Sequence, residues 1–93
     1  MTGSPRFVTP PGVAWTEGSD AWGRTLVYVA PLPHGPVSVL PDQSAAIWLA
    51  AVEGRGDVVE EVAKLTGNDA DEVRDDVDAF VTELIDRGLL RKV

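Results

Sequence analysis

The sequence predicts an α+β domain in which a three-stranded antiparallel sheet is followed by a three-helix bundle. Two observations carry this prediction. The first half is rich in β-branched and aromatic residues grouped between turn formers. The second half has apolar residues at helical spacing between capping residues. Neither half can bury its apolar face alone, so each is expected to cover the other.

Three strands are expected in the first half, over residues 12–16, 24–30 and 35–40, with the sequences GVAWT, RTLVYVA and GPVSVL. Strands joined in order usually pair in order, so the third strand should lie at an edge of the sheet. An edge strand has backbone N–H and C=O groups without partners. Residues 37–40 contain no charged residue and no proline that would blunt this edge.

Three helices are expected in the second half, over residues 41–54, 57–67 and 69–87. Asp42 is a candidate N-cap for the first helix, which should end at a glycine. Asp57 can cap the second helix, since a glutamate follows three residues later. The large side chains expected to fill the joint core are those of Trp15, Trp48 and Phe80.

The chain length of 93 residues is that of one domain. Residues 1–11 are expected to form a flexible N-terminal arm, because Pro, Gly and Ser are frequent there, and residues 12–93 the single domain. The sequence has no cysteine, no apolar run long enough for a membrane span and no signal peptide, so we expect a cytoplasmic protein without a membrane partner.

Charge and composition exclude several functions. Residues 57–87 contain 11 acidic and 3 basic side chains within a net charge of −7, so a nucleic-acid backbone is an unfavourable partner. His34 is the only histidine, and without cysteine an ordinary zinc site is excluded. No nucleophile motif or phosphate-binding loop is present. We therefore expect no enzymatic activity, no metal and no cofactor.

The predicted third helix has a wider apolar arc than one contact requires. Its expected core stripe consists of Val73, Val77, Phe80 and Leu84. Val81 and Ile85 extend the arc to roughly 140°. Two interpretations remain open for these two residues. They pack on the second helix or the tail, or they line a groove whose other wall is the third strand, where an extended peptide could add as a fourth strand.

Two stretches resemble the PqqD family: VLPDQSAAIWLAAVEG at 39–54 and DDVDAFVTELIDRGLL at 75–90. The matching positions are Val39, Leu40, Ala45, Ala46, Ile47, Trp48, Gly54, Asp76, Val77, Phe80, Val81, Leu84, Gly88, Leu89 and Leu90. In order and spacing the resemblance covers residues 12–90. It implies a RiPP recognition element of winged-helix-like shape. Such proteins are stand-alone peptide chaperones that bind the leader of a ribosomally made precursor and deliver it to a radical SAM enzyme or a leader peptidase.

The resemblance also implies the peptide-binding residues. The leader should lie as an added strand between the third strand and the third helix. Carried over by position, its contacts are Pro36, Val37, Ser38, Val39, Leu40, Arg74, Val77, Asp78, Val81 and Ile85. This chain departs from the family at Pro41, where the family often has Asn, and in the proline-rich loop at 31–36.

Two other classes of function remain as alternatives. A protein–protein adaptor or a homodimer would use the same sheet edge. A winged-helix DNA-binding protein would usually place its hairpin after the recognition helix and carry basic residues on that helix, whereas here the sheet comes first and the last helix is acidic.

Overall fold

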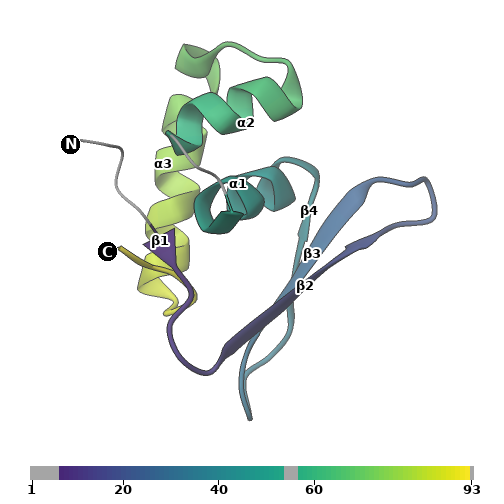
Figure 1. Cartoon of the computed structure of the whole chain (residues 1–93), viewed down its shortest axis with the longest axis vertical. Helices are drawn as coiled ribbons and strands as arrows, with labels where there is room; N and C mark the ends of the chain where they lie inside the picture. Colours follow the sequence, from purple (N-terminus) through teal and green to yellow (C-terminus); the bar gives the residue numbers. More distant parts are fainter. Residues whose placement is uncertain (1–6, 54–56, 93) are drawn as a thin grey trace.

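The computed structural model of the chain describes residues 7–53 and 57–92. Its elements follow one another in Figure 1 as β1 (Phe7–Val8), β2 (Val13–Ser19), β3 (Thr25–Pro31), β4 (Ser38–Pro41), α1 (Asp42–Glu53), α2 (Val58–Thr66), α3 (Ala70–Asp86) and β5 (Arg91–Lys92). The predicted fold class is therefore confirmed. Gly54, the expected end of the first helix, and residues 1–6 of the expected arm lie outside the described residues.

The main sheet has the order β2-β3-β4 with antiparallel pairing throughout. The β2–β3 hairpin is longer than the sequence indicated, because residues 17–19 pair with β3 instead of forming the turn. The turn is confined to residues 20–24. There the Asp20 carboxylate accepts hydrogen bonds from the backbone N–H groups of Trp22 and Arg24, at 2.8 and 2.9 Å. A short side chain that bonds to nearby backbone is typical of such turns.

A six-residue connection, 32–37, joins β3 to β4. The N–H of Gly35 donates to the carbonyl oxygen of Pro31 at 2.8 Å, which folds the connection back on the end of β3. A Cβ atom at position 35 would collide with the ring of Pro31. Only glycine therefore fits this close approach.

Helix α1 is the centre of the fold. It contacts β3 and β4 on one side, α2 and α3 on the other, and β1 at its end. Its buried residues are Ala45, Ile47, Trp48, Ala50 and Ala51. The ring of Trp48 is fully buried and meets that of Trp15 edge to face, with centroids 6.0 Å apart. Two of the three expected large core groups thus join the sheet to the helices.

Capping residues set both ends of α2, and a glycine follows the end of α3, as the sequence indicates. The Asp57 carboxylate accepts from the N–H groups of Val59 and Glu60, at 2.9 and 3.2 Å, and begins α2. Gly67 ends α2 and Gly88 follows α3, with left-handed φ angles of 75° and 77°. Glycine adopts this conformation without the steric cost of a Cβ atom.

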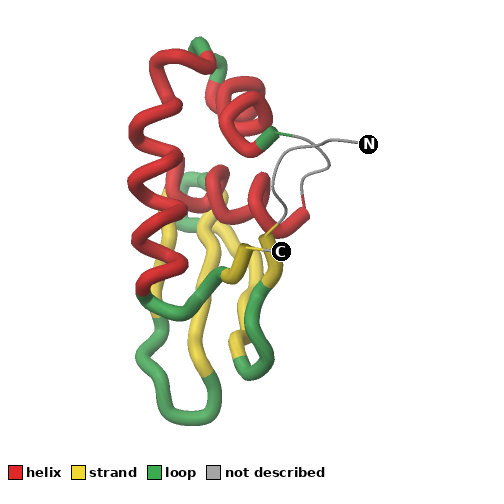
Figure 2. Tube along the Cα trace, turned by 90° about the vertical axis from the view of Figure 1, so that its left-hand side faces the viewer, coloured by secondary structure: helices red, strands yellow, loops and turns green. Residues whose placement is uncertain are grey.

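The two ends of the described chain meet in a second, two-stranded sheet. Phe7 pairs with Lys92 and Val8 with Arg91. The strand β1 lies against α1, and Figure 2 shows the two short strands together. Part of the segment expected to form an arm therefore has a place in the fold, with Phe7 packed on the core.

The buried face of α3 is rotated about the helix axis relative to the predicted stripe, so that it includes Val81 in place of Phe80. The buried residues are Val73, Val77, Val81 and Leu84. Phe80, expected at the centre of the core, is only partly buried. Val81, for which packing and groove lining were both left open, is 9% exposed. The reason is that α2 and the terminal ribbon approach α3 from the Val81 side. No helix in the described part of the chain is long and apolar enough to span a membrane.

Candidate functional site

The strand β4 forms an edge of the main sheet among the described residues. It pairs with β3 alone, from Ser38 opposite Val29 to Pro41 opposite Leu26. The backbone polar groups of an antiparallel strand point alternately to its two sides, so those directed away from β3 have no strand partner there. Val39 is 51% exposed and Leu40 is buried, which sets an alternating pattern along the edge. This edge can accept a further strand.

The C-terminal end of α3 is linked to β4 by one side chain. The Nη2 atom of Arg87, the C-cap residue of α3, donates to Ser38 Oγ at 2.7 Å, across 49 positions in the sequence. At about 100° per residue, four side chains of α3 lie within roughly 40° of Arg87, and one of them, Val73, is buried in the core. The other three, Asp76, Phe80 and Glu83, together with Arg87, are called the β4-facing flank. Arg87 also lies 3.6 Å from the Glu83 carboxylate, an exposed pair. Phe80 is the one apolar side chain of this flank.

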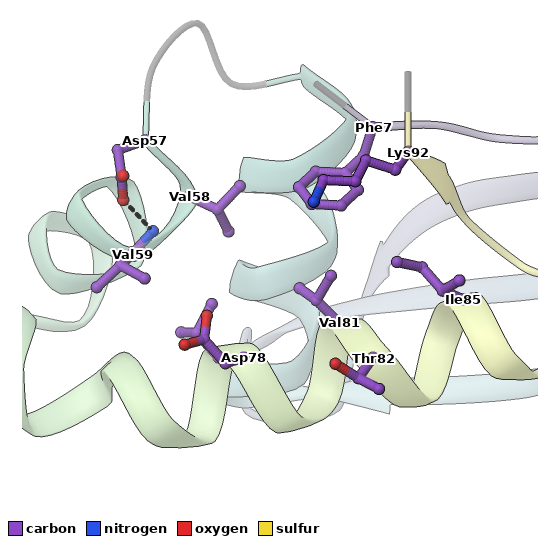
Figure 3. A pocket seen from close by; sticks show the side chains of 10 residues that line it. Phe7, Asp57, Val58, Val59, Asp78, Val81, Thr82, Ile85 and Lys92 are labelled. Carbon is purple, nitrogen blue, oxygen red and sulfur yellow. Dashed lines mark hydrogen bonds between the residues drawn. The ribbon is translucent and has the colours of Figure 1, made fainter. Parts of the chain in front are cut away.

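The opposite flank of α3 lines a trough of about 270 Å³ (Figure 3). Its walls come from α3, from the start of α2 and from the β1–β5 ribbon. The lining residues are Phe7, Asp57, Val58, Val59, Val77, Asp78, Val81, Thr82, Ile85 and Lys92. In Figure 3 the side chain of Val81 points toward Phe7, while Asp57 and Asp78 lie at the other end.

The predicted strand residues lie along the edge. Val37 is 63% exposed in the connection before β4. Pro36 beside it is also exposed. Ser38 is half-buried beneath Arg87. The predicted set therefore contains both the exposed side chains and the backbone that an added strand would meet.

The predicted helix residues lie elsewhere. Val77, Asp78, Val81 and Ile85 line the trough. Arg74 is exposed and paired with Asp71 at 3.4 Å. The structure therefore does not bring these five residues together with β4. The side chain that reaches β4 is that of Arg87, the C-cap residue after α3, which was predicted only as the end of the helix.

A helical wheel does not distinguish the two borders of an apolar arc, and this explains why the predicted and observed neighbours of α3 differ. Hydrophobic periodicity gives the width of an apolar arc but not which neighbour lies at each border. A signal was present in the spacing of Phe80, Glu83 and Arg87, a large apolar residue with charged residues three and seven positions later on one face. This pattern is typical of a border that faces a partly open surface.

In residues 7–53 and 57–92, no three His, Asp or Glu side chains come together as a metal site. A sheet edge that no described strand pairs with, beside a guanidinium group, can hold an extended chain through backbone hydrogen bonds and a few side chains.

A family model described as "Coenzyme PQQ synthesis protein D (PqqD)" matches residues 32–90. The matched span contains β4, the three helices and the buried Leu89 and Leu90 that follow α3. No curated protein and no solved structure matches the chain. The matched residues thus include the edge and both flanks of α3.

Proposed function

Because the chain belongs to the PqqD family, we propose that it is a peptide chaperone that binds the leader of a ribosomally made precursor peptide and delivers it to a tailoring enzyme. Family membership supports a non-catalytic role in the synthesis of coenzyme PQQ or of a related peptide-derived product. The chaperone holds one end of the precursor while the enzyme acts on another part.

The observation that carries the proposal is the open edge of β4. The leader adds there as a fourth strand, antiparallel or parallel, along residues 36–40. Main-chain hydrogen bonds supply affinity that does not depend on leader sequence, and pockets for alternate side chains supply specificity. The edge segment carries no charge in a chain of which 25% is charged, so it suits an apolar leader segment.

The β4-facing flank of α3 supplies the second set of contacts. Alternate side chains of an added strand point toward the helix, where Phe80 offers a partly buried apolar surface. Arg87 must give up its hydrogen bond to Ser38 when a chain passes between them. The released guanidinium can then form a bidentate pair with a leader carboxylate, through two parallel hydrogen bonds. We propose these contacts instead of those predicted from the sequence for Arg74, Asp78 and their neighbours, which line the trough or are exposed on another flank of α3.

Delivery requires a second protein. The family supports a radical SAM enzyme as the recipient, and a leader peptidase is the alternative for a different class of product. Neither the precursor nor the product follows from the site, because the strand contacts are mostly to backbone.

An N-methyl scan of the leader tests strand addition. Single N-methyl groups are placed along a synthetic leader peptide that binds the chain, and each methylated peptide is titrated by fluorescence anisotropy. Methylation of amides that face β4 should weaken binding about tenfold or more, since each removes a buried backbone hydrogen bond. Methylation of the intervening amides should have little effect. An effect without a two-residue period contradicts the proposal.

Sedimentation equilibrium is the control for self-association. An exposed edge can also pair with the edge of a second copy. A chain that stays monomeric at the concentrations of the titration leaves the edge available to the leader. A tight dimer whose dissociation is not promoted by leader would favour the homodimer.

A further inference from the structure

We propose that the trough is the docking site for the tailoring enzyme, through a segment that carries a large apolar side chain and an arginine or lysine about 10 Å apart. The inference rests on the proposed function, because it assumes that a second protein receives the precursor. It assigns to that protein a surface separate from the leader site.

The shape of the trough suits protein side chains. Its volume of about 270 Å³ is below the usual lower limit for small-molecule pockets, roughly 300 Å³. The floor is apolar, formed by Val77 and Val81, and Ile85 is 36% exposed at one end. An apolar side chain entering at that end would meet Val81, Ile85 and Phe7 (Figure 3).

The charges of the trough give it a direction. The Asp78 side chain is exposed at one end, and the Lys92 side chain lies over Phe7, between Asp78 and Ile85 (Figure 3). Asp78 and Ile85 are seven residues apart on α3, which is about 10 Å along the helix axis. Residues 57–87 contain 11 acidic and 3 basic side chains. Electrostatic complementarity therefore favours an occupant whose cation lies over Asp78.

The position of the trough separates it from the leader. On a regular helix, Asp78 points about 180° away from Arg87, which faces β4. A leader paired with β4 therefore leaves the trough free. A chaperone that delivers its cargo must hold the leader and the enzyme at the same time, and two opposite flanks of one helix allow this.

The first experiment uses two defined probes, the capped peptides acetyl-Phe-Ala-Arg-amide and acetyl-Phe-Ala-Glu-amide. In an extended chain their two side chains project to the same side from Cα atoms about 7 Å apart, and the flexible side chain of the last residue spans the remaining distance. Each is titrated at low salt into the ¹⁵N-labelled full chain. The Arg peptide should shift the amide signals of Asp78, Val81 and Ile85 and bind at least about threefold more tightly than the Glu peptide. Asp78→Lys should reverse this preference. Equal binding of both peptides, or shifts elsewhere, would overturn the inference.

The matched control is Glu72→Lys, which makes the same charge change on the same helix about 120° away from Asp78. It should retain the preference for the Arg peptide. If it reverses the preference as Asp78→Lys does, the effect is one of net charge and the trough has no role. Thermal melts of both variants establish that each is folded.

The second experiment identifies the occupant. The tailoring enzyme that acts on the bound precursor should bind Asp78→Lys at least about tenfold more weakly than the wild-type chain, while the affinity for leader stays within twofold. Unchanged enzyme binding overturns the inference and leaves the leader site intact. If the precursor peptide alone shifts the amide signals of the trough residues, the inference is also overturned, because the trough then binds the precursor. If the wild-type chain does not bind leader, the proposed function is wrong. The titrations with the Arg and Glu peptides are independent of that result.

Discussion

The two flanks of α3 continue the same apolar arc but meet different neighbours. On the trough side, Val77 and Val81 are buried beneath α2 and the terminal ribbon, at 1% and 9% exposure. On the β4 side, Phe80 is only partly buried and the helix is tied to the strand through Arg87 and Ser38. The chain covers one border of its apolar stripe with its own elements and leaves the other border less covered. The proposed peptide site lies on the less covered side.

The largest expected effect is on stability, from Val81→Asp. A carboxylate at this buried position is taken out of water among apolar side chains and disrupts their packing, so the free energy of unfolding should fall by about 3 kcal/mol. Urea denaturation measures this change. Ile85→Asp, on the same flank but 36% exposed, should cost less than about 1 kcal/mol. Equal losses would show that the two side chains do not differ in burial.

Phe80→Ala should have the next largest effect, and on binding. Truncation removes the aromatic wall beside β4, so leader affinity should fall about tenfold, or about 1.4 kcal/mol. The unfolding free energy should fall by about 2 kcal/mol, less than the ~3–5 of a fully buried ring. Ile85→Ala is the matched apolar truncation on the other flank. It should leave leader affinity within twofold. Equal losses of leader affinity from Phe80→Ala and Ile85→Ala would contradict the placement of the leader between β4 and Phe80.

Ser38→Ala should have the smallest effect. It removes the acceptor that Arg87 must leave when a leader enters. An exposed hydrogen bond contributes only about 0.5 kcal/mol, so leader affinity should rise about twofold with little change in stability. Isothermal titration calorimetry resolves such a difference. A clear loss of affinity would mean that the Ser38 hydroxyl itself contacts the leader.

The element order and the helix ends follow from local chemistry and could be predicted. Asp57 caps α2 with its own side chain, and Gly67 and Gly88 supply left-handed residues where helices end. The edge position of β4 also follows from strand order. The length of β2 could not be predicted, because Glu17 and Ser19 lie in a stretch typical of turns. Only pairing with β3 makes them part of a strand.

The border of α3 that is buried could not be predicted, for a physical reason. Phe80 lies at one border of the apolar arc and Val81 and Ile85 lie toward the other, and either border could face the core. The choice depends on which flank α2 and the terminal ribbon cover, and it involves the pairing of Phe7 with Lys92, 85 positions apart in the numbering. Such a long-range contact leaves no periodic trace in the sequence of α3.

The most direct test of the account is a set of nuclear Overhauser effects between the leader and the labelled chain. Leader amide and Hα protons should show cross-strand contacts to the backbone of Ser38, Val39 and Leu40, and leader side chains should contact the ring of Phe80. Contacts confined to Val81 and Ile85, with the backbone of β4 unaffected, would contradict it.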